Sequence, residues 1–208
     1  SGSWNASGAT VSNLSIANYE IEFSAIADYD SPANKSLAVT KDNTTTYTGT
    51  YVQHKGSVKV NIDDPANGKW RFTGETSWRN AGSTASDIVV GNYTIEFLEV
   101  DGYFTPGNVN VTVTKDTLHT EDITYVKKTG SLKITTIPED GKWRIVGETE
   151  WRNSGDKVDD IPIGNVEVEF YGTFSHNPPA NKTYVIESNK TTRDTVEYEI
   201  KIVRVKVN

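Results

Sequence analysis

The sequence predicts an all-β protein, a tandem array of three small β-sandwich repeats of which the first is incomplete. Three observations predict this fold class. Whole segments recur with a period of 73 to 74 residues. Apolar and polar residues alternate with period two, and no 3.6-residue apolar stripe persists beyond two turns. Turn residues interrupt the chain every 8 to 12 residues, which is typical of a β-sandwich.

Two stretches carry the repeat most clearly. The segment 68–72 (GKWRF) returns at 141–145 (GKWRI), and 74–82 (GETSWRNAG) returns at 147–155 (GETEWRNSG). A partial copy opens the chain, where Trp4 matches Trp78. The repeat predicts these boundaries: an incomplete sandwich over 1–55, sandwiches over 56–129 and 130–202, and over 203–208 a strand equivalent to the first strand of a next repeat.

Each element of the second repeat follows from its local pattern. Alternation predicts a first strand at 57–62 and later strands at 93–98 and 109–113, while short apolar runs predict strands at 88–90 and 123–126. Turns are expected at 63–68 and at Gly91-Asn92, and a loop at 102–107.

A hairpin is expected around Gly74-Glu75. A two-residue loop pairs Arg71 with Trp78 and Trp70 with Arg79, which allows reciprocal cation–π contacts. A three-residue loop instead places Trp78 opposite Phe72, and the sequence leaves both registers open.

Composition excludes several classes of protein. There is no Cys, so disulfides and Cys-based metal sites are ruled out. The absence of Met indicates a processed or excised piece. The net charge is −7 and the basic residues are scattered, so nucleic acid is not an expected partner. No apolar stretch approaches the roughly 20 residues that a membrane span needs.

The pattern offers no catalytic machinery. The three histidines, His54, His119 and His176, occupy non-equivalent repeat positions without a partner at ligand spacing. Acidic pairs lie in turns, where Asp is expected for local hydrogen bonding, at Asp28/Asp30, Asp63/Asp64 and Asp159/Asp160. We therefore predict no enzyme activity, no catalytic residue, no metal and no cofactor. Calcium at a domain junction and a covalent Lys–Asn cross-link stay open.

Glycans enter the prediction in two ways. Eight sequons are candidate N-glycosylation sites and indicate an extracellular surface protein, unless Asn- and Thr-rich strands produce them incidentally. They start at Asn5, Asn13, Asn34, Asn43, Asn92, Asn110, Asn181 and Asn189. The tryptophans recur at fixed repeat positions, as core residues do, so the candidates for stacking on a surface glycan are loop aromatics. These are Tyr29, Tyr103, Phe104 and Phe174.

The repeat motif also resembles a known class of module. Trp143-Arg144, Gly147, the stretch 151–155, Gly164 and 168–170 resemble the PEGA-like and immunoglobulin-like repeats of secreted and cell-surface proteins. In the first copy, Trp4, Ser7-Gly8 and 19–23 carry the same resemblance. It covers nearly the whole chain and implies a stalk, spacer or adhesive array rather than a specific activity.

The two ends of the chain predict how it assembles. Residues 205–208 (VKVN) are identical to 58–61, the first strand of the second repeat, and the first copy lacks that strand. We expect Val203, Val205 and Val207 to be donated to the first domain of another copy, near Trp4, Tyr19, Ile21 and Phe23. Such head-to-tail contact makes the chain its own partner in a pilus-like surface filament.

One feature argues against that expectation, and an alternative function stays open. The first copy also lacks a counterpart of the 68–72 strand, which 203–208 is too short to supply. The alternative function is a monomeric stalk or adhesin fragment of a larger surface repeat protein, with glycan binding as a further option.

Overall fold

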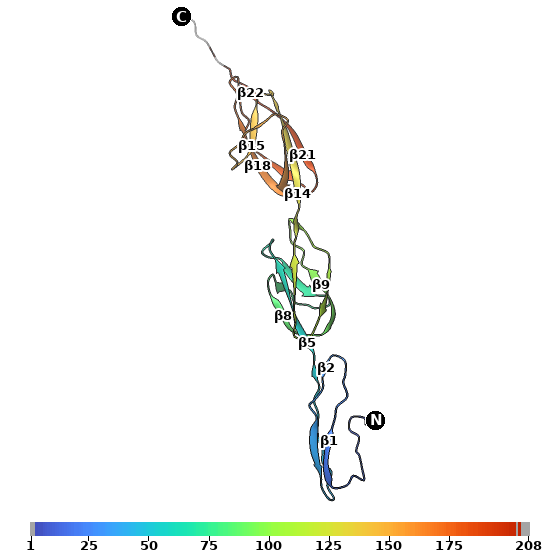
Figure 1. Ribbon diagram of the computed structural model, residues 1–208. Helices are drawn as coiled ribbons and strands as arrows, with labels where there is room; N and C mark the ends of the chain where they lie inside the picture. Colours follow the sequence, from blue (N-terminus) through green and yellow to red (C-terminus); the bar gives the residue numbers. More distant parts are fainter. Residues whose placement is uncertain (1–2, 203, 205–208) are drawn as a thin grey trace. The chain divides into compact units, whose positions relative to one another are not determined.

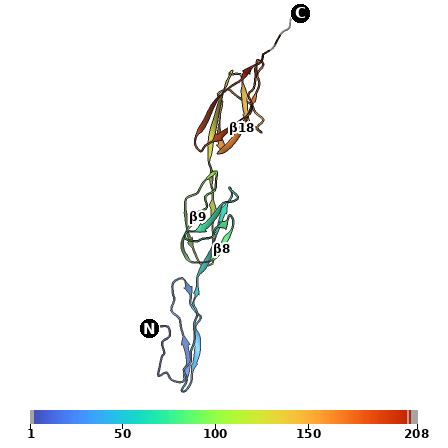
Figure 2. The same ribbon diagram turned by 180° about the vertical axis from the view of Figure 1, so that it is seen from behind.

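A computed structural model describes residues 3–202 and 204. The described chain is all-β, with no helix, and therefore no helix that could span a membrane. It divides into two compact units: residues 1–97 with 107–123, and residues 98–106 with 124–208. Figure 1 shows the strands, and Figure 2 shows them from behind.

The first unit contains two sheets that enclose a common core. The central strand β5 (Lys55–Ile62) lies between β8 (Thr84–Val89), which is antiparallel, and β12 (Leu118–Ile123), which is parallel. The other sheet has the order β11-β9-β6-β7, formed by Val109–Val113, Gly91–Phe97, Lys69–Phe72 and Arg79–Asn80. Period-two alternation buries Val58, Val60 and Ile62 of β5, as the sequence predicts.

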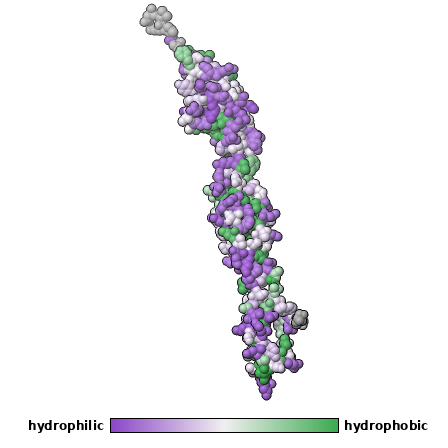
Figure 3. All heavy atoms as spheres, viewed as in Figure 1, coloured by the Kyte–Doolittle hydropathy of each residue, from purple (hydrophilic) through white to green (hydrophobic). Residues whose placement is uncertain are grey.

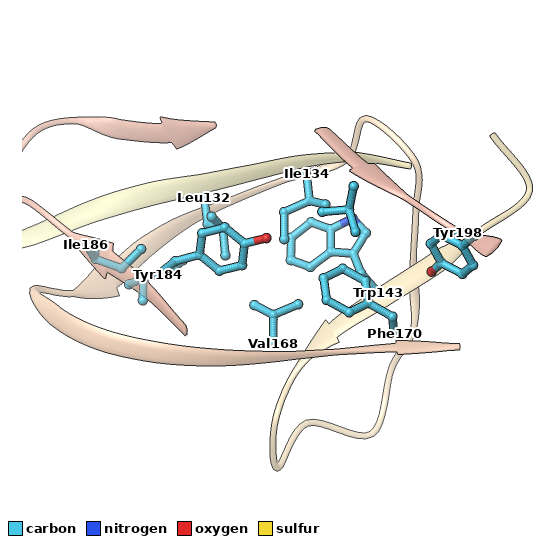
Figure 4. Packing of buried hydrophobic residues seen from close by; sticks show 10 residues of the cluster. Leu132, Ile134, Trp143, Val168, Phe170, Tyr184, Ile186 and Tyr198 are labelled. Carbon is cyan, nitrogen blue, oxygen red and sulfur yellow. The ribbon is translucent and has the colours of Figure 1, made fainter. Parts of the chain in front are cut away.

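The second unit repeats this topology. Its three-stranded sheet has the order β17-β14-β21 (Lys157–Pro162, Thr129–Ile137 and Thr191–Glu197). Its four-stranded sheet has the order β16-β15-β18-β20 (Arg152–Asn153, Lys142–Ile145, Gly164–Tyr171 and Lys182–Ile186). Trp143 is fully buried and lies in the middle of the core, beside Phe170 and Ile134 (Figure 4).

The first 55 residues differ from these sandwiches. Their longest strands, β1 (Ala17–Ile21) and β3 (Lys35–Val39), pair only with each other. The two-residue strands β2 (Tyr29–Asp30) and β4 (Val52–Gln53) also pair, as do β10 (Tyr103–Phe104) with β13 (Val126–Lys127) and β19 (His176–Asn177) with β22 (Glu199–Ile200). No residue from 3 to 55 is buried. This segment therefore has strands but no core.

Several predicted elements need correction. The strand expected at 88–90 is β8, which starts at Thr84, and the loop expected at 102–107 contains the short strand β10. The strand expected at 123–126 is wrong, because the ladder runs over β12 and only Val126 joins another strand, β13. β12 is polar and lies at a sheet edge, so it shows no apolar run. β9 starts at Gly91, where a turn was expected. The second hairpin strand shrinks to β7, since the chain turns over 73–78.

Candidate functional site: an open strand position

Residues 3–53 keep the turns of the complete sandwiches although they lack a core. Gly8 and Asn13 have φ of 80° and 61°, and their counterparts one repeat later, Gly82 and Asp87, have 74° and 59°. The same holds for Asp28 and Asp42, at 63° and 55°, whose counterparts are Gly102 and Asp116, at 81° and 53°. Non-glycine residues adopt this left-handed region rarely, so its recurrence identifies the same local backbone.

Tyrosine hydroxyls brace the N-terminal segment in the same way. Tyr19 Oη donates to Ser15 O at 3.2 Å, as Tyr93 Oη donates to Val89 O at 2.9 Å. Tyr51 Oη donates to Ser24 O at 2.7 Å, as its counterpart Tyr125 donates to Leu98 O at 2.7 Å. These bonds fix the loops around the hairpin of β1 and β3.

Among residues 3–54, the structure shows no counterpart of the central strand β5. In the first sandwich β5 pairs with β8 on one side and β12 on the other. The counterparts of β8 and β12 are residues 10–15 and 44–49, and neither forms a strand. A segment without a neighbouring strand forms no ladder, and its backbone N–H and C=O groups are left to bond with water. We call the place between 10–15 and 44–49 the open strand position.

Apolar side chains around the open strand position are exposed to solvent. Val11, Leu14 and Tyr47 are 53%, 40% and 43% exposed. Apolar residues show on the surface of the N-terminal segment in Figure 3. Among the predicted acceptor residues, Tyr19, Ile21 and Phe23 are half-buried, whereas Trp4 is 65% exposed. Exposed apolar side chains beside segments that have no partner strand are typical of a pairing site.

Trp4 is exposed because it lacks the arginine contact that its counterparts Trp78 and Trp151 make. Trp78 and Trp151 each stack under an arginine, with 4.2 Å from the guanidinium carbon of Arg71 or Arg144 to the indole centroid. Those arginines lie on β6 and β15, the GKWR strands that the first copy lacks. Trp4 therefore has no counterpart of this arginine among the described residues.

The hairpin register that pairs Trp70 with Arg79 is confirmed, but the two-residue loop is wrong, because the chain turns over 73–78 between β6 and β7. Trp70 pairs with Arg79, whose guanidinium carbon lies 5.0 Å from the indole centroid, and Trp143 and Arg152 repeat the arrangement at 5.3 Å. The alternative, with Trp78 opposite Phe72, is excluded. Reciprocal Arg–Trp stacking is thus a structural device of both sandwiches.

The hairpin glutamates were not identified from the sequence. Glu148 accepts from Arg152 with both carboxylate oxygens, one of them at 3.0 Å from Nη2, and accepts from the backbone N–H of Ile145 at 3.3 Å. Glu75 makes the same contacts with Arg79 and Phe72. The repeated Gly-Glu was interpreted only as a turn, although a Glu four residues before the Arg was the available signal.

This ion pair predicts a pH dependence of stability. The hydrogen bonds from Arg152 lower the pKa of Glu148 from 4.5. Because the folded pKa is the lower one, the stabilisation is present above the unfolded value and is lost as the pH falls below about 4.5. We expect Glu148→Gln to lower the urea midpoint at pH 7 more than at pH 3. An equal loss at both pH values would contradict this assignment.

The predicted loop aromatics divide into two kinds. Tyr103 lies in β10, and its ring meets Tyr125 edge-on at 6.3 Å. Tyr29 lies in the corresponding strand β2, and Phe104 has the Lys128 ammonium 5.6 Å from its centroid. Phe174 is fully exposed. The structure thus places three of the four in small sheets, and glycan stacking stays a prediction.

All eight sequon asparagines are exposed to solvent. Two sequons face each other on β9 and β11, where Thr112 donates to Asn92 and Thr94 donates to Asn110, both at 2.8 Å. Glycosylation at these positions stays a prediction.

Residues 3–202 and 204 contain no group of three metal-ligating side chains. The histidines make local polar contacts, such as His54 Nε2 with Asp30 Oδ1 at 3.1 Å. All three predicted donor residues, Val203, Val205 and Val207, lie outside the described residues.

No family model matches the chain, and neither does any curated protein. Among solved structures, the Bacillus anthracis TIE protein matches 80% of the chain with a TM-score of 0.55 at 13% identity. The chain spans 38% of the length of that protein. The minor pilin GBS52 of Streptococcus agalactiae matches 75% of this chain and 99% of its own at 10% identity, with a TM-score of 0.34. A streptococcal ancillary pilin matches 90% of this chain and 76% of its own at 13% identity, with a TM-score of 0.31. At such identities, the first of these likenesses shows only that the chain shares its fold with part of the Bacillus anthracis protein.

Proposed function

We propose that this chain is a non-enzymatic, extracellular structural protein, a subunit that polymerises head-to-tail by β-strand donation. Its residues 1–55 form an incomplete sandwich repeat of the PEGA-like type, followed by complete repeats at 56–129 and 130–202. The strand 203–208 of one copy occupies the open strand position of the next copy. The product is a pilus-like surface filament.

One observation carries this proposal: no residue from 3 to 55 is buried, although the turns match those of a complete sandwich. A segment of this kind gains stability only when another strand covers its apolar side chains. Residues 205–208 repeat the sequence of 58–61, where the two valines of β5 are completely buried in the core. In the same register, Val205 and Val207 take the places of Val58 and Val60.

The hydrogen bonds of the complete sandwiches define how the strand would pair. Val60 O of β5 accepts from Gly82 N at 2.7 Å, and Ile134 O of β14 accepts from Gly155 N at 2.8 Å. The counterpart of these glycines in the first copy is Gly8, so in the proposed complex its N–H would donate to Val207 O. Residues 10–15 and 44–49 then become strands because each gains a backbone partner.

The donated strand does not replace β6. Residues 203–208 are too few to supply a counterpart of 68–72 as well, so the completed terminal domain keeps a two-stranded sheet of β1 and β3 opposite a three-stranded one. The edge of β1 near Phe23 stays without the strand that β6 gives to β9.

Electron microscopy of the full chain and of the chain ending at Ile202 tests the proposal. We expect filaments from the full chain and monomers from the truncated one. A matched control, Val205→Asp with Val207→Asp, keeps the length but places charges in the core position and is expected to block assembly as well. Filaments from all three proteins would overturn strand donation.

Hydrogen exchange on the same samples distinguishes the remaining outcome. In filaments the amides of 10–15 and 44–49 should exchange slowly, and in the truncated chain rapidly. Monomers of the full chain with rapid exchange at these segments would instead identify a stalk or adhesin fragment.

A further inference from the structure

A donated strand needs a way to avoid the wrong sandwich. Residues 205–208 have the same sequence as 58–61 of β5, so these residues fit the first complete sandwich as well as the open strand position. Strand exchange between identical elements of different copies is a common route to misassembly. The donor differs two positions before the identical stretch, where Val203 stands in place of Gly56 of β5 and Gly130 of β14.

The complete sandwiches have no room for a side chain at that position. A Cβ on Gly56 would lie closer than 3.0 Å to Thr114 O and to the Val113 side chain. A Cβ on Gly130 would approach Glu187 O and Lys190 O in the same way. The glycine is required here by close packing against backbone carbonyls, and φ is not the cause, since neither residue has a positive φ.

The loop that makes this contact is tied down in the first complete sandwich. This loop is residues 114–117. Within it, the Lys115 ammonium bonds to Asp30 Oδ1 at 2.5 Å. In the N-terminal segment the counterpart loop is 40–43. Its Lys41 and Asp42 side chains are 81% and 85% exposed, and Asn43 donates only within the loop, to Thr40 Oγ1 and Lys41 O, both at 3.2 Å. This loop can therefore move outward as one piece.

We propose that Val203 is a specificity-determining residue: it directs the donated strand to the open strand position and excludes it from the first complete sandwich. The inference rests on the proposed strand donation. At the open strand position Val203 displaces loop 40–43, which weakens the joint between copies. In the first complete sandwich the same Cβ meets a loop that Lys115 bonds to Asp30, which disfavours exchange with β5. The contact that Val203 makes between copies is thus less closely packed than the contacts of Gly56 and Gly130 inside each sandwich.

Peptides test this inference on the chain that ends at Ile202. A synthetic peptide of residues 197–208 is compared with its Val203→Gly and Val203→Ala forms, by fluorescence titration and by hydrogen exchange. We expect the glycine peptide to bind about tenfold more tightly, since it removes the overlap between the Cβ and the loop. The alanine peptide keeps the Cβ and is expected to bind like the valine peptide.

Hydrogen exchange then reports where each peptide binds. We expect the valine peptide to protect only 10–15 and 44–49, and the glycine peptide to change exchange in β8 and β12 as well. Weaker binding of the glycine peptide, or an alanine peptide that follows glycine, would overturn the role of Val203 while leaving strand donation intact. If no peptide binds, strand donation itself fails, and this inference fails with it.

Discussion

Replacement of Trp143 by alanine is expected to destabilise the C-terminal sandwich by about 4 kcal/mol, which is within the usual range for replacing a buried Trp by Ala. Trp143 is fully buried in the centre of the core, and its indole Nε1 donates to Asn153 O at 3.1 Å. The substitution therefore removes a large apolar contact, a hydrogen bond and the ring beneath Arg152. Hydrogen exchange of the β14 amides measures the loss within this sandwich.

Trp151→Ala is the matched control for this prediction. Trp151 has the same side chain, but it is half-buried and stacks on Arg144 and Tyr171 at the surface. We expect a loss of about 1 kcal/mol from the cation–π and aromatic contacts. Similar losses for the two variants would show that the tryptophans do not divide into a core position and a surface position.

Gly56→Ala is expected to destabilise the first sandwich by about 3 kcal/mol, at the upper end of overpacking effects. The new Cβ would overlap Thr114 O, which is backbone and yields only if the loop moves. Reduced entropy of the unfolded chain offsets about 0.4–1 kcal/mol of this loss. Thermal unfolding, together with hydrogen exchange of the β5 amides, measures the net effect.

Gly107→Ala isolates the steric cause. Gly107 belongs to the same unit, has no positive φ and has open space where the new methyl group would lie. We expect the substitution to be neutral or slightly stabilising, since only the unfolded-chain entropy changes. If Gly56→Ala behaved like Gly107→Ala, the close packing of Gly56 against Thr114 would be wrong, and with it the basis for excluding Val203 from this sandwich.

The sequence predicts the strands whose side chains alternate across a core. Val58, Val60 and Ile62 are buried as expected, and the hairpin register that pairs Trp70 with Arg79 follows from counting residues around Gly74-Glu75. β12 escapes the prediction because it is a polar edge strand whose pairing with β5 comes from residues some 60 positions away. Such a strand is defined by its partner rather than by its own composition.

At the candidate site the sequence predicts pairing that the structure does not show. Residues 10–15 have a strand-like sequence that matches β8, yet they form no strand. Local pattern identifies which residues can pair, and only the presence of a neighbour decides whether they do. The need for glycine at Gly56 was equally hidden, because the carbonyl of Thr114 that fills the space is distant in sequence.

The parallel pairing of the first and last long strands of each sandwich has a mechanical consequence. The chain enters the first sandwich at the start of β5 and leaves it at the end of β12, its parallel neighbour over six residue pairs. Tension along the polypeptide therefore pulls these two strands in opposite directions along their lengths. The hydrogen bonds between them are loaded together in shear, and rupture requires many to break at once rather than one after another. β14 and β21 repeat this arrangement. Each sandwich is built to resist being pulled apart by its ends.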